Sequence, residues 1–103
     1  MAKKKNARSR TAPPPAETAE SEQLSRLAEA LAKYGVGTRV IRREPPVLRV
    51  SNPESEYAVE DVGCERREHG HAFLASFGVH LGTSESIPLT ARKVAWLVGA
   101  TDR

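Results

Sequence analysis

The segment VEDVGCERREHGHAFLASF, residues 59–77, decides the fold that we expect for this chain. His69-Gly70 divides the segment, and a two-residue loop with glycine in second place is typical of a tight β-hairpin turn. Centring the turn there pairs Cys64 with Ala75 and gives one face of the hairpin most of its apolar side chains, namely Val62, Cys64, Phe73, Ala75 and Phe77. This alternation predicts an antiparallel sheet with one buried side.

A helix is expected before the hairpin, over residues 21–34. Its leucines recur at the three- and four-residue spacing of one helix face, at Leu24, Leu27 and Leu31. Ser21 is the candidate N-cap, and Gly35 is suited to the left-handed conformation that ends a helix.

Two strands are expected between that helix and the hairpin, over residues 36–43 and 47–51. The prolines between them have no N–H to donate to a sheet and therefore belong to the connection. Pairing Arg43 with Val47 turns three apolar side chains to the core, those of Val40, Leu48 and Val50.

A second helix is expected near the end of the chain, over residues 88–98. Pro88 suits the first helical turn, and Gly99 suits the C-terminal stop. Residues 79–82, which precede this helix, are interpreted as a short bend or an extra strand. The expected buried stripe of the helix consists of Ile87, Ala91, Val94, Leu97 and Val98.

These elements together predict an α+β fold in the order helix, four-stranded antiparallel sheet, helix. Each helix has one apolar stripe and the sheet has one apolar face, so both helices should pack on the same sheet face as a two-layer sandwich. We assign residues 1–20 to a disordered basic and proline-rich arm, and residues 21–103 to a single small domain.

Positive charge is concentrated at the start of the chain, whose net charge is +3. The five basic residues of the arm, which are candidate contacts for nucleic acid or another polyanion, are Lys3, Lys4, Lys5, Arg8 and Arg10. Such contacts would be sensitive to salt and would not read a base sequence. A solubilising tail without a dedicated partner is the alternative interpretation.

Composition also bears on the compartment. The single cysteine, Cys64, allows no internal disulfide and gives no indication of an oxidising compartment. No apolar run has the length of a signal-peptide core or of a transmembrane helix. We therefore expect a cytoplasmic protein that makes no membrane contact.

The reactive side chains are densest around the hairpin, at Cys64, Glu65, Glu68, His69, His71 and His80. A zinc site would need Cys64 beside histidines, but the expected register leaves His69 and His71 in water at the turn, more than about 10 Å from the thiol. A cysteine–histidine nucleophile fails on the same distance, and no HExxH, P-loop, GxSxG or dinucleotide motif occurs. We expect no catalytic residue, no metal, no cofactor and no enzymatic activity.

Two surfaces remain as candidates for binding. Arg39, Arg43, Arg49 and Arg67 would lie on the open sheet face as a phosphate platform, but Asp61 and Glu65 should lie among them, and a mixed-charge solvated face is favoured. Trp96 lies off the apolar stripe of the last helix and groups with Leu89, Arg92 and Lys93. It is either an interface anchor or a cover for the edge of the core.

From Leu24 onward the chain resembles small single-domain proteins of high-GC Gram-positive bacteria. The resemblance is carried by the segments Tyr34-Gly35-Val36, PVLRVSNP at 46–53, Val62-Gly63-Cys64, Phe73–Gly78 and Leu97-Val98-Gly99. Those proteins are richer in tryptophan in the second strand of the hairpin, where this chain has HAFLASF at 71–77. The resemblance implies the same fold, and no activity is established for the group.

The functional hypothesis is a non-enzymatic interaction module that binds another protein or a second copy of itself. Trp96, Leu89 and Lys93 are its candidate interface residues. The alternative is a nucleic-acid accessory protein that acts through the basic arm.

Overall fold

The computed structural model describes residues 18–100, which form two helices and a five-stranded antiparallel sheet. The helical elements are α2 (Ala19–Leu31), the 3₁₀ turn η1 (Ala32–Tyr34), the 3₁₀ turn η2 (Ser84–Ser86) and α3 (Ile87–Leu97). The strands are β2 (Gly37–Ile41), β3 (Val47–Asn52), β4 (Ser55–Arg67), β5 (Gly70–Leu74) and β6 (His80–Thr83). The α+β class is confirmed.

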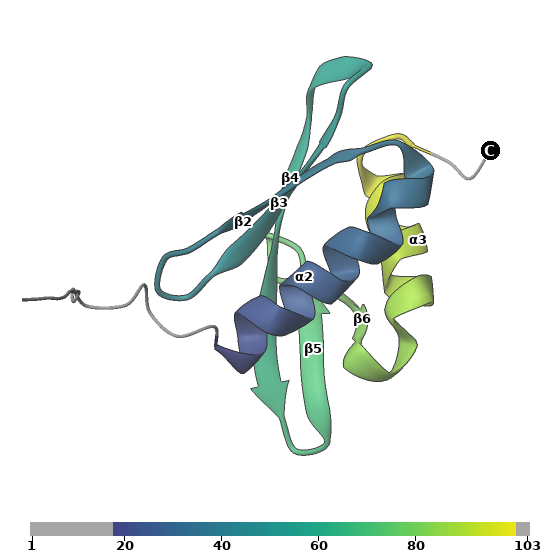
Figure 1. The fold of residues 1–103 in the computed structure, drawn as a ribbon. Helices are drawn as coiled ribbons and strands as arrows, with labels where there is room; N and C mark the ends of the chain where they lie inside the picture. The colour runs from purple at the N-terminus through teal and green to yellow at the C-terminus, as the bar shows by residue number, and fades with distance from the viewer. Residues whose placement is uncertain (1–17, 101–103) are drawn as a thin grey trace, which may run out of the picture.

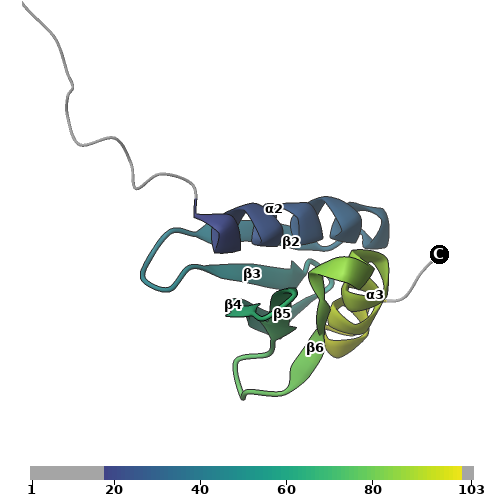
Figure 2. The same cartoon turned by 90° about the horizontal axis from the view of Figure 1, so that it is seen from below.

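The sheet is a meander in which each strand pairs with its neighbour in sequence, in the order β2-β3-β4-β5-β6. Helix α2 lies across the sheet, and α3 lies beside α2 above β6 (Figures 1 and 2). The expected number of four strands is wrong, because the segment 80–83 is an added strand on β5, which was one of its two interpretations. Strands β2 and β6 form the two edges of the sheet.

The hairpin turn lies one residue earlier than expected. The loop is Glu68-His69, Arg67 pairs with Gly70, and Cys64 therefore faces Phe73 rather than Ala75. Gly70 takes a φ of 118° immediately after the loop, where glycine carries little strain. The shift changes the partner of each residue by two positions, so the paired residues of β4 and β5 keep their predicted faces.

Phe77 is the main correction to the hairpin, because the structure leaves it 63% exposed. Strand β5 ends at Leu74, and the chain then reverses in a tight turn in which the Ala75 N–H donates to the Val79 carbonyl over 2.9 Å. Gly78 has a φ of 89° in this turn. The predicted pairing of Val62 with Phe77 is wrong because the second strand is too short to reach that position.

The β2–β3 hairpin shows the same kind of shift. Ile41, rather than Arg43, is the partner of Val47, so the connection is longer than predicted. Leu48 and Val50 are fully buried, as expected from their face of the strand. Register was mispredicted in both hairpins, whereas the buried face was predicted correctly.

Helix α2 begins at Ala19, inside the segment assigned to the arm, and Thr18 is its N-cap. The Thr18 Oγ1 accepts the Ser21 N–H over 3.0 Å, which satisfies one of the free N–H groups of the first turn. Ser21 is therefore inside the helix and buried, and its prediction as the cap is wrong. Gly35 has the predicted left-handed conformation, with a φ of 74°.

The core lies between the helices and one face of the sheet. Its fully buried side chains include Leu24, Leu27 and Leu31 from α2, Leu48, Val50, Val62 and Phe73 from the sheet, and Ala91, Val94 and Ala95 from α3. The Asn52 side-chain amide donates to the Val98 carbonyl over 2.9 Å and so joins the end of α3 to the β3–β4 turn. This contact holds the C-terminal end of α3, whereas its first turn follows β6 through the 3₁₀ turn η2.

Candidate interaction surface on the last helix

The three residues expected at an interface lie together on the outer side of α3. Trp96 is 71% exposed and Leu89 is 61% exposed, and Lys93 lies between them on the same helix face. Spacings of three and four residues place neighbouring side chains on one side of a helix. The interpretation that Trp96 covers the edge of the core is therefore wrong.

The outward position of Trp96 follows from which residues α3 buries. Thr90, Ala91, Val94 and Ala95 face the core, and three of these four positions carry small side chains. Small residues allow α3 to lie close to the sheet, so the bulky side chains have to be on the opposite side. The sequence stripe through Ala91 and Val94 was predicted correctly, but the burial of Thr90 was missed.

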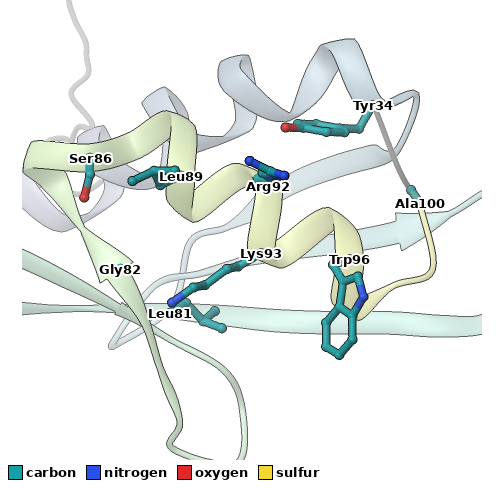
Figure 3. Close-up of a pocket in the computed structure, with 9 residues that line it drawn as sticks. All are labelled: Tyr34, Leu81, Gly82, Ser86, Leu89, Arg92, Lys93, Trp96 and Ala100. Atoms are coloured by element: carbon teal, nitrogen blue, oxygen red, sulfur yellow. The ribbon is translucent and has the colours of Figure 1, made fainter. Parts of the chain in front are cut away.

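A groove of about 680 Å³ runs along this side of α3. It is lined from α3 by Leu89, Arg92, Lys93 and Trp96, and from other elements by Tyr34, Leu81, Gly82, Ser86 and Ala100. Figure 3 shows Lys93 and Trp96 projecting from the same side of the helix, with Leu81 below Lys93. Arg92 projects on the other side, toward the part of the chain that carries Tyr34.

The groove lining is positively charged and partly apolar. It contains Arg92 and Lys93 and no carboxylate, although residues 18–100 as a whole have slightly more acidic than basic side chains. No acidic side chain of the described residues forms an ion pair with either cation. A further cation, Lys33, lies 5.3 Å from the centre of the Tyr34 ring. The surface is thus suited to a ligand that is both acidic and apolar.

Sequence reasoning missed the contribution of β6 to this surface. Leu81 and Gly82 follow no sequence pattern that would indicate a site. Residues 79–82 were interpreted as a short bend or an extra strand, and the sequence did not indicate which elements they contact. The close approach of Gly82 to Thr90 shows that β6 lies next to α3. Local periodicity of the sequence does not indicate which distant elements pack together in this way.

The cysteine–histidine group is arranged differently from the prediction. His71 is not in water at the turn, because its side chain is only 12% exposed and its Nε2 lies 3.3 Å from the Glu20 carboxylate of α2. The shifted register makes His71 a diagonal neighbour of Cys64 on the core face. Among residues 18–100, no group of three or more histidine, cysteine, aspartate or glutamate side chains is placed to hold a metal ion.

Cys64 is buried, and burial raises the pKa of its thiol to about 12, with smaller contributions from the charges of Glu20 and Glu65. A thiol with so high a pKa is protonated at neutral pH, whereas a nucleophilic cysteine needs the thiolate. Burial and nearby carboxylates therefore act against thiol chemistry at this position.

The open sheet face carries mixed charge, as predicted. The Arg49 guanidinium donates two hydrogen bonds to the Asp61 carboxylate, at 2.8 and 3.0 Å, and Arg67 lies 3.1 Å from Glu65. Tyr57 is 90% exposed at the start of β4. Because two of the four arginines are occupied by carboxylates, the face does not have the uniform positive charge of a phosphate platform.

The candidate polyanion contacts, Lys3, Lys4, Lys5, Arg8 and Arg10, lie outside the described residues. Over the described part of the chain, no helix is long and apolar enough to cross a membrane. No family model, curated protein or solved structure matches this chain. The class that the fold defines is a two-layer α+β protein with both helices on one face of an antiparallel sheet.

Proposed function

We propose that this chain is a non-enzymatic protein-interaction module that binds its partner through the outer face of α3. Trp96 is the central contact, Leu89 extends the apolar surface, and Arg92 and Lys93 select a partner with acidic side chains. The observation that carries the proposal is the 71% exposure of Trp96 over a groove lined by cations. Tryptophan and arginine are enriched among the residues that dominate protein–protein affinity.

The cost of exposing Trp96 supports this reading. Among the other large apolar side chains of α3, those of Ile87, Val94 and Leu97 are at least partly buried, and the core forms without the indole ring. An exposed tryptophan contributes nothing to folding through burial, whereas in an interface it buries a large apolar area. The groove also offers the concave shape in which such anchors pair with a partner.

A partner of different sequence fits the surface better than a second copy. In a symmetric dimer through this face, the same surface of both subunits would meet, so Arg92 and Lys93 of one copy would approach those of the other. The groove contains no carboxylate to compensate these charges. Like charges at an interface core oppose association, so the charge pattern favours an acidic partner.

The proposal is tested by comparing two alanine substitutions of exposed aromatic residues. Trp96→Ala removes the proposed anchor, and Phe77→Ala removes an aromatic ring of similar exposure on the β5–β6 turn. Both variants and the unmodified chain are immobilised and used to capture proteins from the native host, and their folding is checked by circular dichroism. We expect at least one protein to be retained by the unmodified chain and by Phe77→Ala and to be lost with Trp96→Ala.

Charge is tested in the same experiment. The Arg92→Glu/Lys93→Glu variant should fail to retain the same protein, and a change in salt concentration should not restore binding. Arg26→Glu provides the control, because Arg26 is an exposed cation on α2 away from the groove. A set of captured proteins that is identical for all variants would contradict the proposal.

A further inference from the structure

We propose that the groove accepts its partner as an extended acidic peptide segment, which adds to the outer edge of β6 as a sixth strand beneath α3. This inference rests on the proposed function and specifies how the partner binds. It identifies the ligand class as an unfolded or loop segment with acidic and apolar side chains on the face that contacts α3. Main-chain hydrogen bonds supply affinity in this mode, and side-chain pockets supply specificity.

The first argument is the position of β6 in the sheet. It is an edge strand with β5 as its neighbour, so its outer N–H and C=O groups have no strand partner among residues 18–100. Unpaired groups of this kind are a template for another strand. The other edge, β2, contributes no residue to the groove lining.

The second argument is that the groove exposes main chain. Gly82 is one of its lining residues, and because glycine has no side chain, what it presents there is backbone. A β-bulge lies beside it, since Gly82 pairs with Phe73 and His80 with Leu74, which leaves Leu81 as the extra residue. Leu81 is only 4% exposed and belongs to the core, and it forms part of the groove lining.

The third argument is the match of dimensions. The α3 side of the groove extends from Leu89 to Trp96, which is about 10 Å at 1.5 Å per helical residue. An extended segment of about three residues spans that length. Strand β6 has 4 residues, so the helix wall and the strand edge have similar reach.

The fourth argument is charge and polarity along the wall. Lys93 and Trp96 project from the same side of α3, as Figure 3 shows, so a segment bound beneath this side of the helix can contact both a cation and an indole ring. Side chains alternate in direction along a strand, so those on one face of the added segment would contact this wall. An acidic side chain at one such position and an apolar one at the next would match Lys93 and Trp96.

The test uses the full chain and a phage-displayed library of linear peptides, random over about eight positions, the length of a long strand. Peptides are selected on the unmodified chain after depletion on Trp96→Ala. We expect the enriched sequences to be acidic with apolar residues at alternate positions. Their affinity should fall about 30-fold with Trp96→Ala and stay unchanged with Phe77→Ala.

Strand addition has a signature that side-chain docking lacks. An enriched peptide is synthesised in two N-methylated forms, each methylated at alternate residues, so that each form loses the N–H donors of one edge. We expect one form to bind at least about tenfold more weakly and the other to bind like the parent, because only one edge pairs with β6. Amide hydrogen exchange should slow in residues 80–83 when the parent peptide binds.

Three results would overturn the inference. They are failure of the library to enrich any peptide, equal binding of both N-methylated forms, and slowed exchange at β2 instead of β6. None of them contradicts the proposed function, which is decided by capture of whole proteins with Trp96→Ala and Phe77→Ala. Conversely, capture of the same host proteins by Trp96→Ala and by the unmodified chain would contradict the proposed function and, with it, this inference.

Discussion

Gly82 of β6 lies so close to Thr90 of α3 that a side chain on the glycine would overlap the threonine hydroxyl. The Cβ of any other residue at this position would also lie only 2.9 Å from the Thr90 Cβ. Thr90 is fully buried, and its hydroxyl donates to the Ser86 carbonyl over 3.1 Å. The missing side chain at Gly82 is therefore what lets α3 approach β6.

We predict that Gly82→Ala lowers the free energy of unfolding by about 1–3 kcal/mol, the usual range for overpacking a dense core. Urea denaturation measures the change. Gly63→Ala is the matched control, because its added Cβ would have the Leu74 carbonyl oxygen at 4.0 Å as its nearest contact. The double variant Gly82→Ala/Thr90→Ala should be less destabilised than the sum of the two single effects, since removal of the hydroxyl relieves the closer of the two overlaps. Equal stability of Gly82→Ala and Gly63→Ala would contradict the packing described.

The Cys64 thiol should react slowly in the folded protein. Its pKa of about 12, against an ordinary 9.0, reduces the thiolate fraction at pH 8 about a thousandfold. We expect iodoacetamide to label Cys64 far more slowly in the native chain than in urea, as followed by mass spectrometry. Similar labelling rates in the two conditions would show that the thiol is accessible and ionised.

The same thiol makes stability depend on alkaline pH. The folded pKa is raised above the unfolded one, so the contribution to stability is fully present below about pH 9 and is lost as the pH rises toward the folded value. The Cys64→Ala variant should lose less stability than the unmodified chain between about pH 9 and pH 11. Parallel stability curves for the two chains would contradict this.

The ion pair between Arg49 and Asp61 should make the stability of the fold depend on pH in the acid range. The hydrogen bond from Arg49 holds the pKa of Asp61 below its usual range, so the pair stabilises the fold above about pH 4 and is lost as the pH falls through the lowered pKa. Asp61→Asn should therefore lose less stability than the unmodified chain as the pH falls below about 4, and the difference should be small because Arg49 is exposed.

Glu56→Gln is the control for this pH dependence. Glu56 is an exposed carboxylate on the same strand, and it has no partner among residues 18–100. Its variant should keep the acid limb of the unmodified chain in urea titrations between about pH 6 and pH 2. An acid limb that is unchanged by Asp61→Asn would contradict the contribution of the pair.

The sequence predicted correctly which strand face is buried, but it did not predict the register of strand pairing, and the reason is physical. Alternation of apolar and polar residues fixes which side of a strand is buried, so Val62, Cys64 and Phe73 were placed correctly. A shift of two positions on the partner strand leaves that alternation unchanged, so the pattern carries no information about it. The turn at Glu68-His69 depends instead on the backbone conformation of Gly70.

The candidate site could be predicted only in part. The helical spacing of Leu89, Lys93 and Trp96 placed these residues on one side of α3, and the structure agrees. Their exposure depends on Thr90 and Ala95, which face the core although neither belongs to the apolar stripe of the sequence. The opposite wall, at Leu81 and Gly82, is brought there by sheet pairing, which local sequence does not specify.

The two phenylalanines give the sharpest test of the hairpin. Phe73 is fully buried opposite Cys64, whereas Phe77 is 63% exposed on the β5–β6 turn, although both belong to the predicted apolar face. Phe73→Ala should lower the free energy of unfolding by about 3–5 kcal/mol, since it empties a core position of an aromatic ring. Phe77→Ala should change it by less than about 0.5 kcal/mol, as is usual for exposed positions. Urea denaturation of both variants distinguishes the observed hairpin from one that pairs Phe77 with Val62, because in that hairpin the two losses would be similar.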